Sequence, residues 1–161
     1  MAVFSKNTLT QVSGFDNQII AGELVYGQNQ FWNLAMASGG APVDLTGVTI
    51  NAQIIRREIS NLQDTRYGLS FDIADYTASA VTPITLTITN NETPTNGLFT
   101  LVINESAWEV ISTDPELNIA ANNPVAFSGR IKLSFPPTGS APAQDIIIFL
   151  LFLVRSDGVV N

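Results

Sequence analysis

An unbroken apolar run, Ile146 to Val154, constrains the fold of this chain more than any other feature of its sequence. As a strand it would extend about 30 Å at roughly 3.3 Å per residue, and it is too short for a membrane-spanning helix, which needs about 20 apolar residues. Successive strand residues point to opposite faces, so both faces of such a strand need apolar cover. The run therefore predicts a buried strand, in which Leu151→Asp is expected to prevent folding.

Other segments alternate between apolar and polar residues, which is typical of strands with one buried face. Turn-forming residues separate these segments, and the polar stretch 58–68 predicts a loop. The expected strands cover 19–26, 31–36, 48–57, 69–76, 84–89, 98–103, 126–135 and 146–154. Together they predict an all-β fold, an antiparallel β-sandwich of about eight strands with an immunoglobulin-like or jelly-roll-like arrangement.

Residues 104–111 form the one segment with a helical pattern. Asn104 can cap this short helix, and Ala107, Trp108 and Ile111 fall on a shared face. In the segment Asp44-Leu45-Thr46-Gly47, the aspartate can cap a turn and the glycine can relieve the bend into the next strand.

The first 16 residues are polar with scattered apolar side chains and a break at Gly14. This pattern predicts a loosely held N-terminal arm, residues 1–16, ahead of one β-sandwich domain, residues 17–161. We expect apolar side chains of the arm and of the segment after it to contact neighbouring subunits. These candidate assembly residues are Phe4, Val12, Phe15, Ile19 and Ile20.

Charge is scarce in this chain, and its distribution narrows the range of partners. Only 13% of the residues are charged, against about 25% in an ordinary soluble domain, and a β-rich surface with so little charge favours self-association into a homo-oligomer. The net charge is −7 and the seven cations are dispersed, which argues against nucleic-acid binding. The N-terminus lacks a basic region followed by an apolar core, so we expect no signal peptide and synthesis in the cytoplasm of the cell that makes the protein.

The sequence offers little catalytic chemistry. It contains no histidine and no cysteine, which excludes the usual nucleophilic triads and His- or Cys-ligated zinc. It has no glycine-rich phosphate loop, so no nucleotide cofactor is expected. Carboxylate pairs could serve a glycosidase, and the first pair could hold Ca²⁺. Their positions at a strand end, at the start of a helix and in a solvated loop explain the three pairs better. The pairs are Asp72 with Asp75, Glu105 with Glu109, and Asp114 with Glu116. We expect a protein that is not an enzyme and uses no metal or cofactor.

Aromatic residues keep a second function open, that of a carbohydrate-binding module. Trp32 lies within an expected strand and Trp108 on the inner face of the expected helix, which favours core packing for both. Tyr67 and Tyr76 border a loop and are the candidate glycan contacts.

The order of several motifs resembles the N-terminal domains of phage baseplate upper proteins. An aromatic strand segment, Phe31–Leu34, is followed by Pro-Val-Asp-Leu-Thr-Gly-Val-Thr at residues 42–49, which opens an alternating strand that ends in arginine. Gly97–Leu101 then leads into the helix segment Glu105–Trp108, and the strand pair 127–135 and 146–154 closes the domain. The resemblance covers about residues 28–158.

This resemblance implies a bacteriophage virion structural protein with other virion proteins as its partners. Docking through strand edges and the arm would need no particular side-chain chemistry. Two locations in the virion fit: a capsid decoration or cement subunit, and a tail or baseplate adaptor.

Overall fold

The computed structural model describes residues 18–25, 30–65, 68–75, 82–90, 93–117 and 124–155. These residues are mostly β-strand, and they include one α-helix, α1 (Glu105–Ser112), and one short 3-10 helix, η1 (Pro94–Asn96). The strands are β1 (Gln18–Val25), β2 (Gln30–Ala35), β3 (Ala37–Ser38), β4 (Ala41–Pro42), β5 (Thr49–Thr65), β6 (Gly68–Asp75), β7 (Ile84–Asn90), β8 (Leu98–Ile103), β9 (Val125–Phe135) and β10 (Gln144–Arg155).

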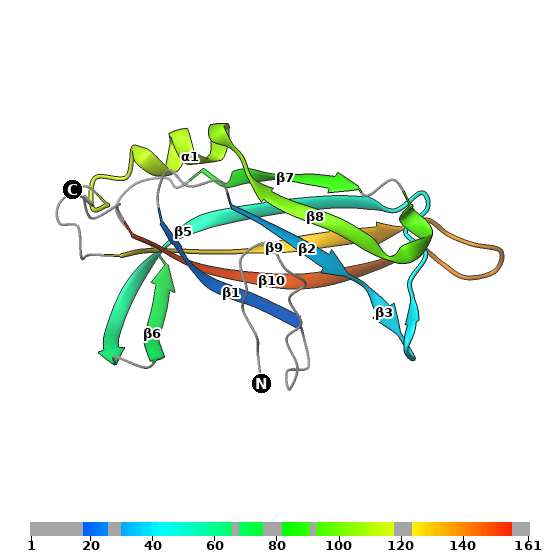
Figure 1. The fold of residues 1–161 in the computed structure, drawn as a ribbon, viewed down its shortest axis with the longest axis horizontal. Helices are drawn as coiled ribbons and strands as arrows, with labels where there is room; N and C mark the ends of the chain where they lie inside the picture. The colour runs from blue at the N-terminus through cyan, green and yellow to red at the C-terminus, as the bar shows by residue number, and fades with distance from the viewer. Residues whose placement is uncertain are drawn as a thin grey trace.

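The main sheet has the strand order β1-β10-β9-β5-β7-β8-β2, with β6 paired to β5, and β3 and β4 form a separate small hairpin. Strand β7 turns the corner between two halves of this sheet. Its residues Ile84–Leu86 pair with β5, whereas Thr87–Asn90 pair with β8. The half formed by β7, β8 and β2 therefore lies over the half formed by β5, β9 and β10, and the sheet nearly closes on itself (Figure 1).

The all-β prediction with one short helix is confirmed, but the expected antiparallel two-sheet sandwich differs from the structure in two respects. The two halves are one continuous sheet because β7 belongs to both. The sheet is also mixed, because β1 runs parallel to β10 with Gln18 opposite Ile148. Parallel neighbours need a long connection, and here nearly the whole chain lies between the two strands.

A two-stranded ribbon replaces the loop expected at residues 58–68. Strand β5 pairs with β9 as far as Arg57, and beyond that point it continues to Thr65 alongside β6, with an irregularity between Ile59 and Asn61. This ribbon projects away from the rest of the sheet (Figure 1). The β5 half of the ribbon, residues 58–65, is polar and lacks the alternation of a half-buried strand, which is why the pattern predicted a loop there, whereas β6 matches the strand expected at 69–76.

The core is organised around the inward face of β10. Ile148, Leu150, Phe152 and Val154 are each at most 3% exposed. Trp32 of β2 stacks on Phe152, with ring centroids 5.2 Å apart and the ring planes inclined by 20°. Because β2 ends the strand order on one side and β10 lies next to last on the other, this contact holds the two halves of the sheet together across its open side.

The outward face of β10 is only partly covered, contrary to the expectation of cover on both faces. Leu153 is buried, Ile147 and Leu151 are half-buried, and Phe149 is 42% exposed. The half-buried position of Leu151 removes the basis for expecting Leu151→Asp to prevent folding. Leu150 is the core position on this part of the strand.

Gly129 allows the sheet to curve where β9 meets its two neighbours. It lies opposite Ile54 of β5 and Leu150 of β10. A Cβ atom added to Gly129 would lie 1.9 Å from the carbonyl oxygen of Gln53, a distance that no side chain can adopt. Glycine is required here because the backbones of β5 and β9 approach so closely.

The two faces of β10 give a test of this packing. We expect Leu150→Ala to lower the free energy of unfolding by about 2–5 kcal/mol, because it leaves a cavity in a closed core. Leu151→Ala on the outward face should cost clearly less, since that side chain is half-buried. Urea denaturation of both variants measures the difference. Equal losses would mean that the outward face is packed as tightly as the inward one.

Candidate functional site

Arg56 ends the inward-facing row of β5 and is buried, with 6% of its surface exposed. Its Nε donates to Asp114 Oδ2 at 2.6 Å, and its Nη2 donates to Glu116 Oε2. Both acids lie just after α1, so this cluster, the Arg56 clamp, fastens the end of the helix to the sheet. The pair Asp114 and Glu116, expected to be solvated loop residues, instead neutralises a buried cation.

The second carboxylate pair lies on the exposed side of α1. Asn104 caps the helix as predicted, since its Oδ1 accepts a hydrogen bond from the Ala107 N–H at 3.0 Å. The predicted inner face of the helix is also confirmed, because Ala107, Trp108 and Ile111 are buried. Glu105 and Glu109 are exposed. Both lie at the helix surface, and Glu105 is in the first turn, where the helix dipole favours an acid.

The remaining carboxylates and the candidate glycan contacts belong to the ribbon or to its flanks. Asp72 and Asp75 are on β6, in register with Asn61 and Arg57 of β5. Tyr67 and Tyr76 lie outside the described residues.

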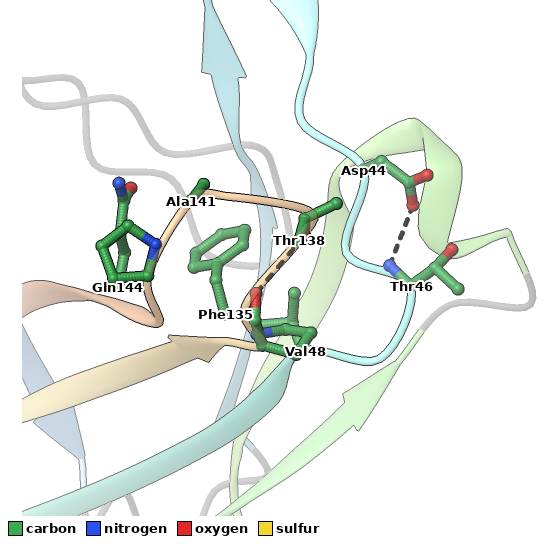
Figure 2. A pocket seen from close by; sticks show the side chains of 9 residues that line it. Asp44, Thr46, Val48, Phe135, Thr138, Ala141 and Gln144 are labelled. Atoms are coloured by element: carbon green, nitrogen blue, oxygen red, sulfur yellow. Dashed lines mark hydrogen bonds between the residues drawn. The ribbon is translucent and has the colours of Figure 1, made fainter.

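A pocket of about 420 Å³ lies between the turn that precedes β5 and the tip of the β9–β10 hairpin (Figure 2). The hairpin tip is at the end of the sheet away from α1 (Figure 1). The walls of the pocket combine an aromatic ring, prolines and other apolar groups with hydroxyl, amide and carboxylate groups. The lining residues are Asp44, Thr46, Val48, Phe135, Pro136, Thr138, Ala141, Pro142 and Gln144.

Local hydrogen bonds fix the first wall of this pocket. Asp44 Oδ1 accepts a hydrogen bond from the Thr46 N–H at 2.9 Å, and Gly47 follows with a left-handed φ of +73° (Figure 2). The predicted capped turn with its glycine is thereby confirmed. Hydrogen bonds from the Thr46 side chain and backbone lower the pKa of Asp44, so its carboxyl group is ionised at neutral pH.

The second wall is the hairpin tip. Thr138 and Ala141 exchange backbone hydrogen bonds of 3.2 and 3.0 Å around a turn that contains Gly139 at a φ of +59°. Pro136 and Pro142 flank the turn and limit the backbone on either side. Both walls are therefore held in place by hydrogen bonds within their own turns.

A separate apolar surface lies on the outward face of β1 and β10, and we name it the Phe149 patch. Its strands are in register, with Ile19 opposite Phe149 and Ala21 opposite Leu151. Its members are half-buried or exposed side chains: Ile19, Ala21, Ile147, Phe149 and Leu151.

Two ion pairs lie at the ends of the Phe149 patch. Lys132 Nζ is 2.9 Å from Asp145 Oδ2, and Arg155 pairs with Glu23. Asp145 accepts hydrogen bonds from Lys132 and Ser134, and these bonds lower its pKa, the one from Lys132 having the larger effect. In the described part of the chain, β1 has a strand partner only on the β10 side, so its other edge is open beside the patch.

The candidate assembly residues are divided by this geometry. Ile19 belongs to the Phe149 patch, whereas Ile20 points into the core with 5% of its surface exposed. Phe4, Val12 and Phe15 lie outside the described residues. Alternation along β1 explains the separation of Ile19 from Ile20, since neighbouring strand residues face opposite sides.

Sequence patterns alone did not identify the Phe149 patch or the pocket. The run 146–154 is apolar at every position, so it carries no signal that distinguishes its covered face from its exposed one. The pocket joins two turns far apart in the chain. The Asp44 turn and the stretch 136–142 both contain turn-forming residues, but neither signal indicates that the two turns meet.

Comparisons with known proteins assign neither a family nor a function to this chain. No family model matches this chain, and no curated protein matches it. Among the described residues, no group of three or more acidic side chains is placed to hold a metal ion, and no helix is long and apolar enough to cross a membrane.

The Arg56 clamp predicts a large and specific stability effect. We expect Arg56→Met to lower the free energy of unfolding by about 3–5 kcal/mol, because it leaves the carboxylate of Asp114 buried without this partner. Glu116→Gln should cost only about 0–1 kcal/mol, since Glu116 is 53% exposed. Chemical denaturation measures both.

A second substitution separates charge from packing at this clamp. If the buried charge of Asp114 without Arg56 causes the loss, adding Asp114→Asn to Arg56→Met should restore part of the stability. A double variant that is less stable than Arg56→Met alone would show that the lost arginine packing dominates.

Proposed function

We propose that this chain is a non-enzymatic structural subunit of a bacteriophage virion, which assembles with neighbouring virion proteins through the Phe149 patch and the open edge of β1. The observation that carries the proposal is the continuous apolar surface at a sheet edge. Exposed aromatic and aliphatic side chains beside unpaired backbone groups are the features that strand-edge docking uses.

The chemistry of this surface suits a protein partner. Phe149 is 42% exposed and lies beside half-buried Ile19, Ile147 and Leu151, so a partner that covers them removes apolar area from water. A strand added to β1 would gain backbone hydrogen bonds at the same time. The ion pairs Lys132–Asp145 and Arg155–Glu23 would form a polar rim around this contact.

Three other observations support a structural role. The motifs between about residues 28 and 158 resemble a virion module, and the low charge content favours an assembled state, including a homo-oligomer. Of the three carboxylate pairs considered for catalysis, one binds Arg56 and another lies exposed on α1. Both positions in the virion, capsid decoration or cement and tail or baseplate adaptor, are compatible with docking through a sheet edge.

A matched pair of substitutions tests the docking surface. We expect Phe149→Asp to reduce incorporation into particles at least tenfold, because a charge would be buried in the contact, while thermal stability changes little. Val110→Asp on α1 is the control, since Val110 is 50% exposed and lies outside the patch. Quantitative blotting of purified particles assembled with each variant measures incorporation. Equal incorporation of the two variants would exclude the Phe149 patch as the contact.

Cryo-electron microscopy of the particle tests the proposal as a whole. Density for this chain on the capsid lattice would support the decoration or cement position, and density in the tail would support the adaptor position. A purified virion without this chain would contradict the structural role.

A further inference from the structure

We propose that the pocket between the Asp44 turn and the β9–β10 hairpin tip binds a neutral carbohydrate unit. This inference is independent of the assembly role, because the pocket residues Asp44, Thr46 and Thr138 do not belong to the Phe149 patch. Its volume of about 420 Å³ falls within the roughly 300–1,000 Å³ typical of small-molecule sites.

The composition of the walls matches the surface of a sugar. A pyranose ring has an apolar C–H face and a rim of hydroxyl groups. Phe135, Pro136 and Pro142 can cover the apolar face, because aromatic and proline rings offer flat apolar surfaces. Side chains that can exchange hydrogen bonds with hydroxyl groups line the same pocket: Asp44, Thr46, Thr138 and Gln144.

The charge of the pocket selects against anions. Asp44 is the one charged residue among the nine that line it, and no lysine or arginine lines it. A carboxylate accepts hydrogen bonds but donates none, so it suits the hydroxyl groups of a neutral sugar and repels phosphate, sulfate or an acidic sugar. Phosphate binding would have required a cation or converging N–H groups.

The walls are also arranged before a ligand arrives. The Asp44–Thr46 hydrogen bond holds the Asp44 carboxylate, and the paired backbones of Thr138 and Ala141 fix the hairpin tip, which lowers the entropy lost on binding. The same pairing disfavours an extended peptide, which needs free backbone groups at a strand edge. In the hairpin tip these groups of Thr138 and Ala141 already bond to each other.

The test is titration of the full-length protein with a panel of neutral sugars, namely glucose, galactose, mannose and N-acetylglucosamine and their oligosaccharides, followed by calorimetry or NMR. We expect saturable binding of at least one of them. Asp44→Ala should weaken it about tenfold or more, because a hydrogen bond to a charged group is lost and the turn loosens. Thr138→Val, which keeps the side-chain shape, should weaken it several-fold.

Two controls separate a lost contact from a lost fold. Asp44→Asn can still accept the Thr46 N–H, so it should keep the wild-type melting temperature while it weakens sugar binding. Glu109→Gln removes an exposed carboxylate on α1, outside the pocket, and should leave the affinity unchanged. Since the pKa of Asp44 lies below its usual value of 3.8, affinity should stay constant between about pH 5 and 8 and fall only at lower pH.

Three results would overturn the proposal. The first is the absence of saturable binding to every neutral sugar of the panel. The second is a sugar affinity that Asp44→Ala and Thr138→Val leave unchanged, which would place the binding elsewhere. The third is Asp44-dependent binding of a proline-rich peptide in place of any sugar. Failure of this test would leave the docking role of the Phe149 patch unaffected, because that role is measured by particle incorporation.

Discussion

The contact between Trp32 and Phe152 is the interaction on which the closed form of the sheet depends. It joins β2, the last strand of one half, to β10 in the other half, and no strand pairing links these two strands in the part of the chain that the structure describes. Removing both rings from water stabilises the closure, and the stacked geometry limits how the halves are oriented. Gly129 contributes from the opposite side, since its missing side chain lets β5 and β9 approach closely enough for the sheet to curve.

This closure gives the molecule two ends with different chemistry and one distinct flank. At one end the Arg56 clamp fastens α1 to the sheet, so the charged side chains at this end stabilise the fold. At the other end the Asp44 turn and the hairpin tip enclose a pocket whose single charge lies at its surface. The Phe149 patch lies on the flank, and its members are not among the residues that line the pocket.

Local features were predicted correctly because their causes are local. The cap at Asn104, the buried side of α1 and the Asp44 turn each depend on side chains within a few residues of the backbone groups that they contact. The strand expected at 69–76 corresponds to β6, but the continuation of β5 over residues 58–65 was missed. That segment pairs with β6 and shows no alternation, and a polar segment without alternation resembles a loop.

The sequence by itself determined that this chain is a β-protein with one short helix, because strand alternation and helix capping depend only on residues that are close together in the sequence. Only the tertiary structure decided that β1 runs parallel to β10, that β7 joins two halves into one sheet, and which face of β10 is covered. In the apolar run 146–154 every position favours burial equally. Burial of Leu150 and exposure of Phe149 therefore follow from which strands and side chains reach each face, and that depends on contacts between residues distant in sequence.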